Sequence, residues 1–404
     1  MTADSGQRTA DSGQSAVRCP LSAVRWVPGN HVRLLQSGAE FFPALIAAFD
    51  AARHEIHLET YIFNADASGE AVRDALMRAA RRGVAVRVLV DAVGSRELPS
   101  SWRDALASAG VELMAYRPLV SGWHANPKSL RRLHRKLAVI DARVGFVGGM
   151  NLIDDYEPVR FEQPRLDYSV EVQGPLIAAL HRSVRRMWQR VALTRLRPAA
   201  RTAVEPSWPT DGRTRAAFVV RDNFAHRRDI ERAYLAALAF ARRDILIANA
   251  YFLPGRRFRK LLMRATARGV RVRLLVQGHT DHPFFQLAAR ALYRELLAAG
   301  VEIAEYHASE LHAKVAVVDG HWATVGSSNI DPFSLLLARE ANVLVDDRAF
   351  AEALRARLDA AWTGAAKLDP ADWQRRPWWR RQLSEAAYAA VRVVLGMLGA
   401  GRWA

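Results

Sequence analysis

The segment LHRKLAVID (residues 133–141) occurs a second time, nearly unchanged, as LHAKVAVVD (residues 311–319). Both copies keep a histidine, a lysine and an aspartate in the same register, and the second histidine follows the first by 178 residues, from 134 to 312. This separation is too long for a local turn and has the length of a small domain. The repetition therefore predicts that the chain contains one domain twice.

Other segments are repeated in the same order around the motif. The segment RRGVAVRVLVD (81–91) matches ARGVRVRLLVQ (267–277), and AGVELMAYR (109–117) matches AGVEIAEYH (299–307). A repeated unit of about 170 residues is too long for one turn of a solenoid, so two globular domains are predicted. Each unit ends in a predicted helix that carries a tryptophan, Trp188 in the first and Trp362 in the second.

Strand and helix patterns alternate within the first unit. Residues 56–63 and 84–90 are apolar or alternate branched residues with arginine, as strands do. Each is followed by a helical pattern, the second of which covers 102–109 and has Gly110 in position to end it. This order predicts an α/β fold in which a mixed or mostly parallel sheet is flanked by helices.

The repeat also divides the chain into segments. Residues 1–28 repeat the polar sequence TADSGQ without an apolar run, which predicts a disordered tail. Residues 195–213 are rich in proline and arginine and are predicted to link the two domains. The remaining predicted segments are the domains 29–194 and 214–366 and a C-terminal tail, 367–404.

Composition excludes several classes of protein. The only cysteine among 404 residues is Cys19, so an internal disulfide framework and zinc sites built on cysteine pairs are excluded. No secretory signal and no apolar run long enough to span a membrane is recognisable in the sequence. The formal net charge of +17 favours a polyanionic partner, either nucleic acid or an acidic membrane, although an arginine-rich protein from a GC-rich genome has the same excess.

The residue types in the motif indicate a reaction centre. His134 and Lys136 are two residues apart, so their side chains lie on one face of a strand, as do those of His312 and Lys314. The motif aspartates, Asp141 and Asp319, follow their histidines by an odd number of residues and face the other way. We therefore predict that the aspartates have a structural role, such as fixing the turn after the strand.

Two further pairs of residues follow the motif in both copies, and the asparagines do so in the same register. Asn151 and Asn329 each follow their histidine by 17 residues, at the end of GGMN and GSSN, where small residues let an anion approach closely. Asp167 and Glu340 precede the next predicted strand of each copy. A carboxylate that holds one imidazole nitrogen leaves the other free to react. We predict that Asp167 orients His134 and that Glu340 orients His312.

This set of side chains suits a phosphodiester. The lysines and asparagines would hold phosphate oxygens, one neutral histidine would attack phosphorus, and the other would protonate the leaving oxygen. The sequence shows no dense group of histidines and carboxylates at metal-ligand spacing, so no metal is predicted. A duplication that serves folding alone would not need a histidine and a lysine on one strand face in both copies.

The duplicated His-x-Lys-x4-Asp pattern resembles the signature of the phospholipase D superfamily over about residues 29–366. The resemblance implies two homologous domains, each a mixed sheet flanked by helices, that share one active site at their interface. It also implies metal-independent catalysis through a phosphohistidine, with His134 as nucleophile and His312 as general acid and base. The signature positions implied as catalytic are His134, Lys136, Asp141, His312, Lys314 and Asp319.

Several stretches, including IHLETYIF (56–63) and GSSNIDPFSL (326–335), resemble bacterial cardiolipin synthases of the form without N-terminal transmembrane helices. This resemblance implies phosphatidyl transfer between two phosphatidylglycerol molecules, which gives cardiolipin and glycerol without a cofactor. It further implies a peripheral enzyme on an anionic bacterial membrane, at its cytoplasmic face, with no nucleic-acid partner. The alternatives are a phosphodiesterase that hydrolyses phospholipid or nucleic acid, and a basic binding protein with an inactive site.

The C-terminal tail has an unusual composition. WQRRPWWRRQ (373–382) interleaves tryptophan and arginine, and AAYAAVRVVLGMLGAG (386–401) is largely apolar but too short to span a bilayer. Tryptophan and arginine together suit the headgroup region of an acidic membrane. The alternatives are a helix packed on the core of the protein and a site that stacks on single-stranded nucleic acid.

Overall fold

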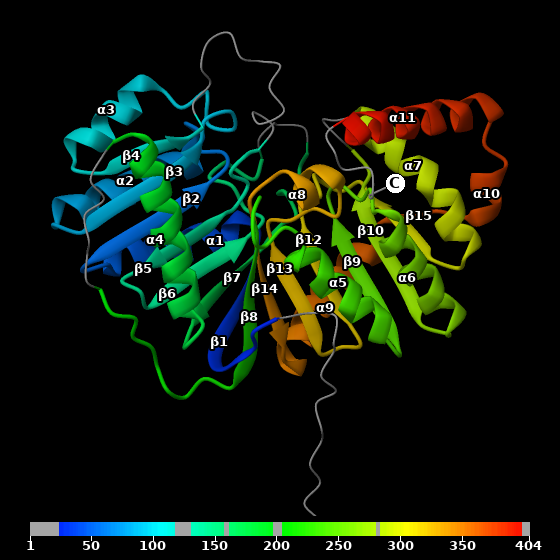
Figure 1. Cartoon of the computed structure of the whole chain (residues 1–404), viewed down its shortest axis with the longest axis horizontal. Helices are drawn as coiled ribbons and strands as arrows, with labels where there is room; N and C mark the ends of the chain where they lie inside the picture. Colours follow the sequence, from blue (N-terminus) through cyan, green and yellow to red (C-terminus); the bar gives the residue numbers. More distant parts are fainter. Residues whose placement is uncertain (1–23, 118–130, 157–160, 197–203, 280–282, 398–404) are drawn as a thin grey trace, which may run out of the picture.

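The computed structural model describes residues 24–117, 131–156, 161–196, 204–279 and 283–397 (Figure 1). Residues 1–23 of the predicted disordered tail, with Cys19, lie outside these ranges. The first strand begins at Val27, two residues before the predicted start of the first domain. Among the described residues, no helix is both long enough and apolar enough to cross a membrane.

Fifteen strands of the described residues form one continuous sheet, in the order β15-β11-β10-β9-β12-β13-β14-β8-β1-β7-β6-β5-β2-β3-β4. The strands of the first half are β1 (Val27–Gln36), β2 (Glu55–Thr60), β3 (Ala85–Asp91), β4 (Glu112–Tyr116), β5 (Leu137–Ile140), β6 (Val144–Gly148) and β7 (Tyr168–Gln173). Those of the second half are β8 (Thr214–Arg221), β9 (Asp244–Asn249), β10 (Arg271–Gln277), β11 (Glu302–Tyr306), β12 (Lys314–Val318), β13 (Trp322–Gly326), β14 (Glu340–Asp346) and β15 (Ala366–Lys367).

The strand order repeats itself about the centre of the sheet. From β1 outward the first half runs β7, β6, β5, β2, β3 and β4, and from β8 outward the second half runs through the equivalent strands to β11, with β15 added at the edge. In each half, three strands are parallel (β2, β3 and β4; β9, β10 and β11) and the others are antiparallel. The predicted α/β fold with a repeated mixed sheet is confirmed, and antiparallel pairing of β1 with β8 joins the two sheets into one.

Helices cover both faces of this sheet (Figure 1). In the first half α1 (Ser37–Ala51), α2 (Ala67–Arg81) and α3 (Ser100–Ser108) pack on one face and α4 (Ile177–Thr194) on the other. In the second half α5 (Asp229–Phe240), α6 (Arg256–Ala267) and α7 (Pro283–Ala298) pack on one face and α9 (Arg348–Thr363) on the other. The remaining helices are α8 (Pro332–Leu336), α10 (Pro370–Gln374) and α11 (Trp378–Met397).

The two halves share part of their core. Val170 of β7 and Val343 of β14 belong to the same cluster of buried apolar residues, which also contains side chains of α4 and α9. The segment between α4 and β8 covers the predicted linker, of which only residues 195–196 and 204–213 are described. A shared sheet and a shared buried cluster fix the position of one half on the other, so both halves can contribute to one site.

The C-terminal segment folds back onto the second half. The Trp373 ring of α10 lies 5.3 Å from the Tyr293 ring of α7, and Val391 and Leu395 of α11 are buried in the core of the second half. One face of α11 therefore packs on the protein itself, as the core-packing alternative predicts. The opposite side of α11 is exposed and is considered below.

Candidate active site

The two histidine motifs lie at the same edge of the sheet. His134 and Lys136 immediately precede β5, which runs antiparallel to β2, so they lie where β2 and β3 end. His312 precedes β12 in the same way, next to the end of β9. Loops at the carboxyl ends of parallel strands are where open α/β sheets place their ligands.

Each motif histidine is held by a carboxylate from the other half of the chain. His134 Nδ1 lies 2.9 Å from Glu340, and His312 Nδ1 lies 2.6 Å from Asp167. The predicted assignment, in which Asp167 orients His134 and Glu340 orients His312, is therefore wrong. Both carboxylates are buried, and a hydrogen bond donated by Ser327 Oγ also holds Glu340.

Backbone pairing between the halves explains this exchange. Leu133 forms an isolated parallel bridge with Arg339, and Leu166 forms one with Leu311. The His134 N–H donates to Arg339 O at 3.0 Å, and the His312 N–H donates to Leu166 O at 2.9 Å. The residue before each histidine is thus paired with the residue before the acid of the other half, which brings acid and imidazole together.

This geometry fixes the tautomer of each ring. A carboxylate at Nδ1 accepts a hydrogen bond from the N–H there and leaves Nε2 as the nitrogen that can attack or transfer a proton. Burial lowers the pKa of His134 and lowers that of His312 well below the usual value, and the nearby lysines add to both effects. Burial also raises the pKa of Asp167 to about 6. A neutral imidazole is the form that a nucleophile requires.

The motif lysines are enclosed beside the histidines. Lys136 is 5% exposed and Lys314 is fully buried, and each Nζ donates to the backbone carbonyl of its own motif histidine, His134 or His312. Burial lowers the pKa of Lys136 to about 7 and that of Lys314 to about 8. An anion bound between them would favour their charged forms.

The predicted phosphate-binding asparagines follow β6 and β13, the strands that pair with the two motif strands. Asn151 accepts a hydrogen bond from the Ile62 N–H at 3.2 Å, and Asn329 is buried with no partner for its Oδ1 among the described residues. One of the two glycines before Asn151 is required by a neighbouring carboxylate. A Cβ on Gly149 would lie 2.2 Å from Asp167 Oδ1, so this glycine makes room for the carboxylate.

The motif aspartates lie at the far end of the motif strands from the histidines. Asp141 accepts hydrogen bonds from the N–H groups of residues 53–55, which lead into β2. Asp319 does the same for residues 242–244, which lead into β9. These contacts fix the turn after the motif strand to the neighbouring strand. They support the predicted structural role of the two aspartates.

Two more positions support the site and were not singled out from the sequence. Asp91 accepts from the Leu133 N–H at 2.8 Å, and Gln277 accepts from the Leu311 N–H at 2.9 Å, so each fixes the residue before a histidine. Asp91 and Gln277 are the last residues of the repeated segments 81–91 and 267–277, and this equivalent position is the feature of the sequence that could have identified them. The Tyr61 ring lies 5.1 Å from the His134 ring.

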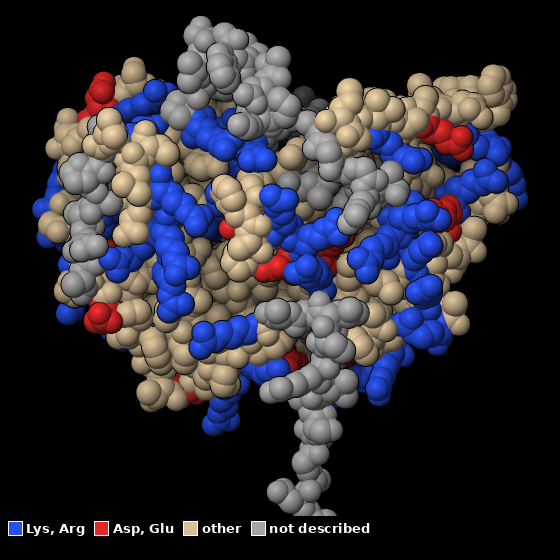
Figure 2. Space-filling view, in the orientation of Figure 1, with Lys and Arg blue, Asp and Glu red and all other residues tan. Residues whose placement is uncertain are grey.

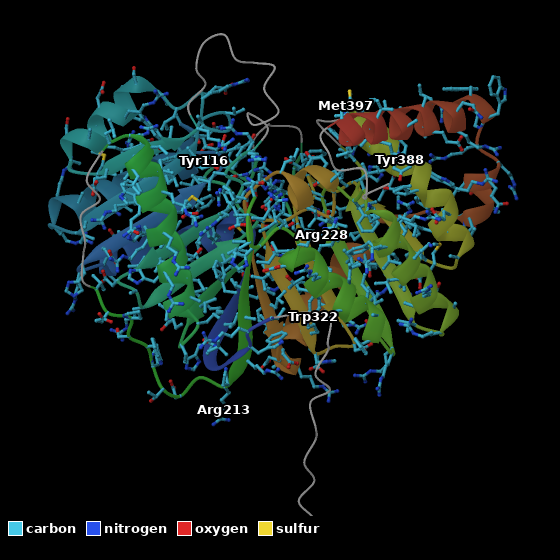
Figure 3. The ribbon with its side chains drawn as sticks, viewed as in Figure 1. Tyr116, Arg213, Arg228, Trp322, Tyr388 and Met397 are labelled. Atoms are coloured by element: carbon cyan, nitrogen blue, oxygen red, sulfur yellow. The ribbon has the colours of Figure 1, made fainter. Side chains whose placement is uncertain are left out.

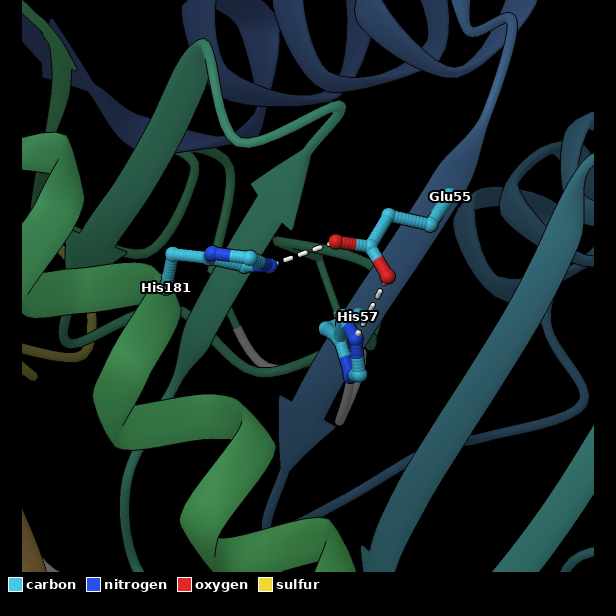
Figure 4. Close-up of side chains that lie close together, drawn as sticks. All are labelled: Glu55, His57 and His181. Carbon is cyan, nitrogen blue, oxygen red and sulfur yellow. Dashed lines mark hydrogen bonds and ion pairs between the residues drawn. The ribbon is translucent and has the colours of Figure 1, made fainter. Parts of the chain in front are cut away.

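One group of side chains has the composition of a metal site. The ligand atoms of Glu55, His57 and His181 lie within 4.8 Å of one another at the far end of β2 (Figure 4). The Arg87 guanidinium lies 3.4 Å from the same Glu55 oxygen that lies 3.3 Å from His57. A cation would have to share this carboxylate with a buried guanidinium, so the group fits a hydrogen-bonded link between β2 and α4 better than a metal site.

Both halves match a known family. The family model described as "Cardiolipin synthase, PLD-like domain" matches residues 45–188 and 234–362, and each match contains one histidine motif. The chain belongs to this phospholipase D-like family. Cardiolipin synthase B of Salmonella typhimurium is 40% identical to it over an alignment of 391 residues that covers 93% of this chain and 91% of that protein. Cardiolipin synthase B of Escherichia coli K12 is 39% identical with the same coverage.

A solved structure shares the fold of this family member. The phosphatidylserine synthase of Haemophilus influenzae matches with a TM-score of 0.65, covering 94% of this chain and 98% of that one. Because the two are only 14% identical, the match speaks for the fold alone. It covers both halves, so the arrangement of two repeats in one chain occurs in a protein of distant sequence.

Proposed function

We propose that the protein is a cardiolipin synthase, a phosphatidyltransferase that joins two phosphatidylglycerol molecules and releases glycerol. The observation that carries the proposal is the pair of histidines held by buried acids from opposite halves, with two enclosed lysines beside them. Identity of about 40% to cardiolipin synthase B over most of both chains supports this choice of substrate.

In the first step, Nε2 of one histidine attacks the phosphorus of phosphatidylglycerol. A nitrogen–phosphorus bond forms and the bond from phosphorus to the glycerol oxygen breaks. The other histidine, which the bound anionic phosphate favours in its protonated form, gives its Nε2 proton to that oxygen. We assign the attack to His134 and the proton transfer to His312 from the family resemblance. Glu340 then stabilises the cationic character that develops on His134.

In the second step, the terminal hydroxyl of another phosphatidylglycerol attacks the same phosphorus. His312 takes the hydroxyl proton, the nitrogen–phosphorus bond breaks, and cardiolipin leaves with His134 restored. Lys136 and Lys314, with Asn151 and Asn329, would hold the non-bridging oxygens and stabilise their charge in both steps. No step in this scheme requires a metal ion.

The enzyme would work at the surface of a bacterial membrane, on its cytoplasmic face. The net charge of +17 supports attraction to an anionic surface. In Figure 2, lysine and arginine side chains gather across the middle of the visible face, where Figure 3 labels Arg228. We expect association with phospholipid and none with nucleic acid.

The decisive experiment supplies the purified protein with phosphatidylglycerol vesicles and a chelator and identifies the products by mass spectrometry. Cardiolipin and glycerol are expected. Phosphatidic acid as the main product would show a phospholipid hydrolase, and cleavage of added DNA without lipid turnover would show a nuclease. Activity that is lost in chelator and restored by a divalent ion would contradict the metal-free scheme.

A further inference from the structure

Helix α11 has two apolar sides, and only one of them is used for packing. Ala387, Val391 and Leu395 are buried against the second half, and the neighbouring Tyr388 is partly buried with them. A second set of apolar residues follows at spacings of three or four, which places it along one side of a helix. This outer stripe consists of Trp379, Leu383, Ala386, Ala390, Val394 and Met397.

The outer stripe faces solvent along the whole helix. The exposed fractions of its large side chains are 51% for Trp379, 52% for Leu383, 40% for Val394 and 74% for Met397, and both alanines are exposed. Arg381, Glu385 and Arg392 lie on a third side of the helix, whereas Arg380 lies in the first turn beside Trp379 of the stripe. Single exposed apolar residues are ordinary, whereas a continuous stripe of this length marks a contact surface.

Cations gather where the helix begins. Arg375, Arg376, Arg380 and Arg381 all lie within seven residues of the sequence beside Trp378 and Trp379, and the Arg380 guanidinium lies 5.1 Å from the Trp379 ring centroid. In Figure 2 the outer surface of α11 is mostly uncharged, and blue side chains gather at the right, where the helix begins. An apolar surface that is bordered by arginines complements the headgroup and upper acyl region of an anionic bilayer.

The stripe also lies toward the end of the molecule that carries the histidines. In Figure 1, α11 crosses the upper end of the second half, toward which β9 and β10 run, and α8 lies below it on the side of the middle of the molecule. Met397, labelled in Figure 3, stands at the end of α11 nearest the middle of the molecule. The segment of α8 follows Asn329, so the same end of the molecule carries the candidate site and the exposed helix.

We propose that the outer stripe of α11 docks the protein on the surface of an anionic phospholipid bilayer, with the end of the sheet that carries both histidines facing the lipid. The inference rests on the proposed function, because a diacyl substrate keeps its chains in the bilayer while its headgroup enters the site. Docking through α11 holds the site at the depth of the headgroups, so that the phosphate need not leave the membrane surface.

The test uses point substitutions in the full chain, because removing α11 would also uncover the apolar side chains of α7. The double variant Leu383→Gln/Val394→Gln changes the stripe, and Leu193→Gln/Phe240→Gln changes two apolar residues that are exposed elsewhere. Binding is measured by flotation with vesicles of equal parts phosphatidylglycerol and phosphatidylcholine, and with phosphatidylcholine alone. Thermal unfolding checks that both variants fold like the wild type.

The stripe variant should bind anionic vesicles at least about tenfold more weakly, and the control variant should bind like the wild type. Turnover of a short-chain phosphatidylglycerol dissolved as monomers should be the same in all three proteins. Unchanged vesicle binding by the stripe variant would overturn the proposal. So would a wild-type dimer in sedimentation equilibrium that the stripe variant loses, because the stripe would then bind a second copy.

The outcomes separate this surface from the reaction. Stripe-dependent vesicle binding by a wild-type protein that makes no cardiolipin would support the docking surface and reject the proposed function. Cardiolipin formation by a wild-type protein whose vesicle binding does not depend on the stripe would reject the docking surface alone.

Discussion

His134 and Glu340 are 206 residues apart in the chain, yet the imidazole Nδ1 and the carboxylate are 2.9 Å apart. His312 and Asp167 form the same contact in the opposite sense, 145 residues apart. Each motif histidine is therefore paired with an acid that the other half supplies. The chemistry of each histidine depends on the position of the other half.

This exchange predicts which step each acid affects. Glu340→Gln should slow formation of the phosphohistidine on His134 by about 100-fold, because the amide no longer stabilises a cationic ring. Asp167→Asn should instead slow breakdown of the phosphohistidine, because Asp167 holds His312, the base that activates the second alcohol. Rapid quench with a phosphodiester that carries a good leaving group measures the two rates separately. Effects in the reverse order would show that the acids serve the histidines of their own halves or that the histidine roles are exchanged.

The two histidines are distinguished by trapping the intermediate. His134→Ala should form no covalent adduct with such an activated diester. His312→Ala should be phosphorylated slowly and keep its adduct, because no base remains to activate the second alcohol. Alkaline quench and peptide mapping by mass spectrometry locate the phosphoryl group. An adduct on His312 in the His134→Ala protein, with none on His134 in the other variant, would reverse the assignment.

Lys136 should lower stability while it supports catalysis. Burial lowers its pKa to about 7, far below the usual value for lysine, so the unfolded chain binds its proton more tightly than the folded protein. The resulting loss of stability is largest at neutral pH and below, and it shrinks as the pH rises toward the unfolded pKa. Lys136→Met should therefore unfold at a higher temperature at pH 7, with a smaller difference at pH 10.

The same variant should lose activity by about 100-fold or more, the usual effect of removing one donor to a transition-state charge. Lys136→Arg, which keeps a cation at all accessible pH values, is the matched comparison. A Lys136→Met protein that is less stable than the wild type at pH 7 would show that the buried ammonium is better compensated than its low pKa indicates.

Asp141 should matter for folding more than for chemistry. Its carboxylate accepts three backbone N–H bonds, so Asp141→Ala leaves these donors without their partner at a cost of about 3 kcal/mol. Asp319→Ala in the second half is the matched comparison and should cost a similar amount. Denaturant unfolding gives both values, with the turnover rate of the folded fraction measured in parallel. A large fall in the turnover rate without a change in stability would place Asp141 in the reaction instead.

The sequence was sufficient for the repeated α/β units and for the residue types of the site, because strand periodicity and the identical register of His134 and His312 are local properties. It could not tell which acid serves which histidine, because the duplicated motifs are nearly the same and both pairings satisfy the pattern. That choice depends on the bridge between Leu133 and Arg339, a contact across 206 residues. The continuous sheet depends in the same way on β1 meeting β8.

Asp91 and Gln277 show a related limit. A carboxylate and an amide at equivalent positions look like unrelated residues in the sequence, and their common task is visible only when each accepts the N–H of a leucine. Helix α11 shows another, because the sequence has one apolar segment where the structure has two apolar sides with different surroundings.

Tyr61 lies against His134. The segment HEIHLETYIF (54–63) is repeated as RDILIANAYF (243–252), which puts Ala250 at the matching position in the second half. If the two halves were identical subunits, every change beside one histidine would be copied beside the other. Because they are consecutive parts of one polypeptide, each half can change independently. A bulky ring can thus narrow the surroundings of one imidazole while a methyl group stands at the matching place in the other half. The joined chain permits a division of labour between donor and acceptor lipids that strict symmetry would forbid.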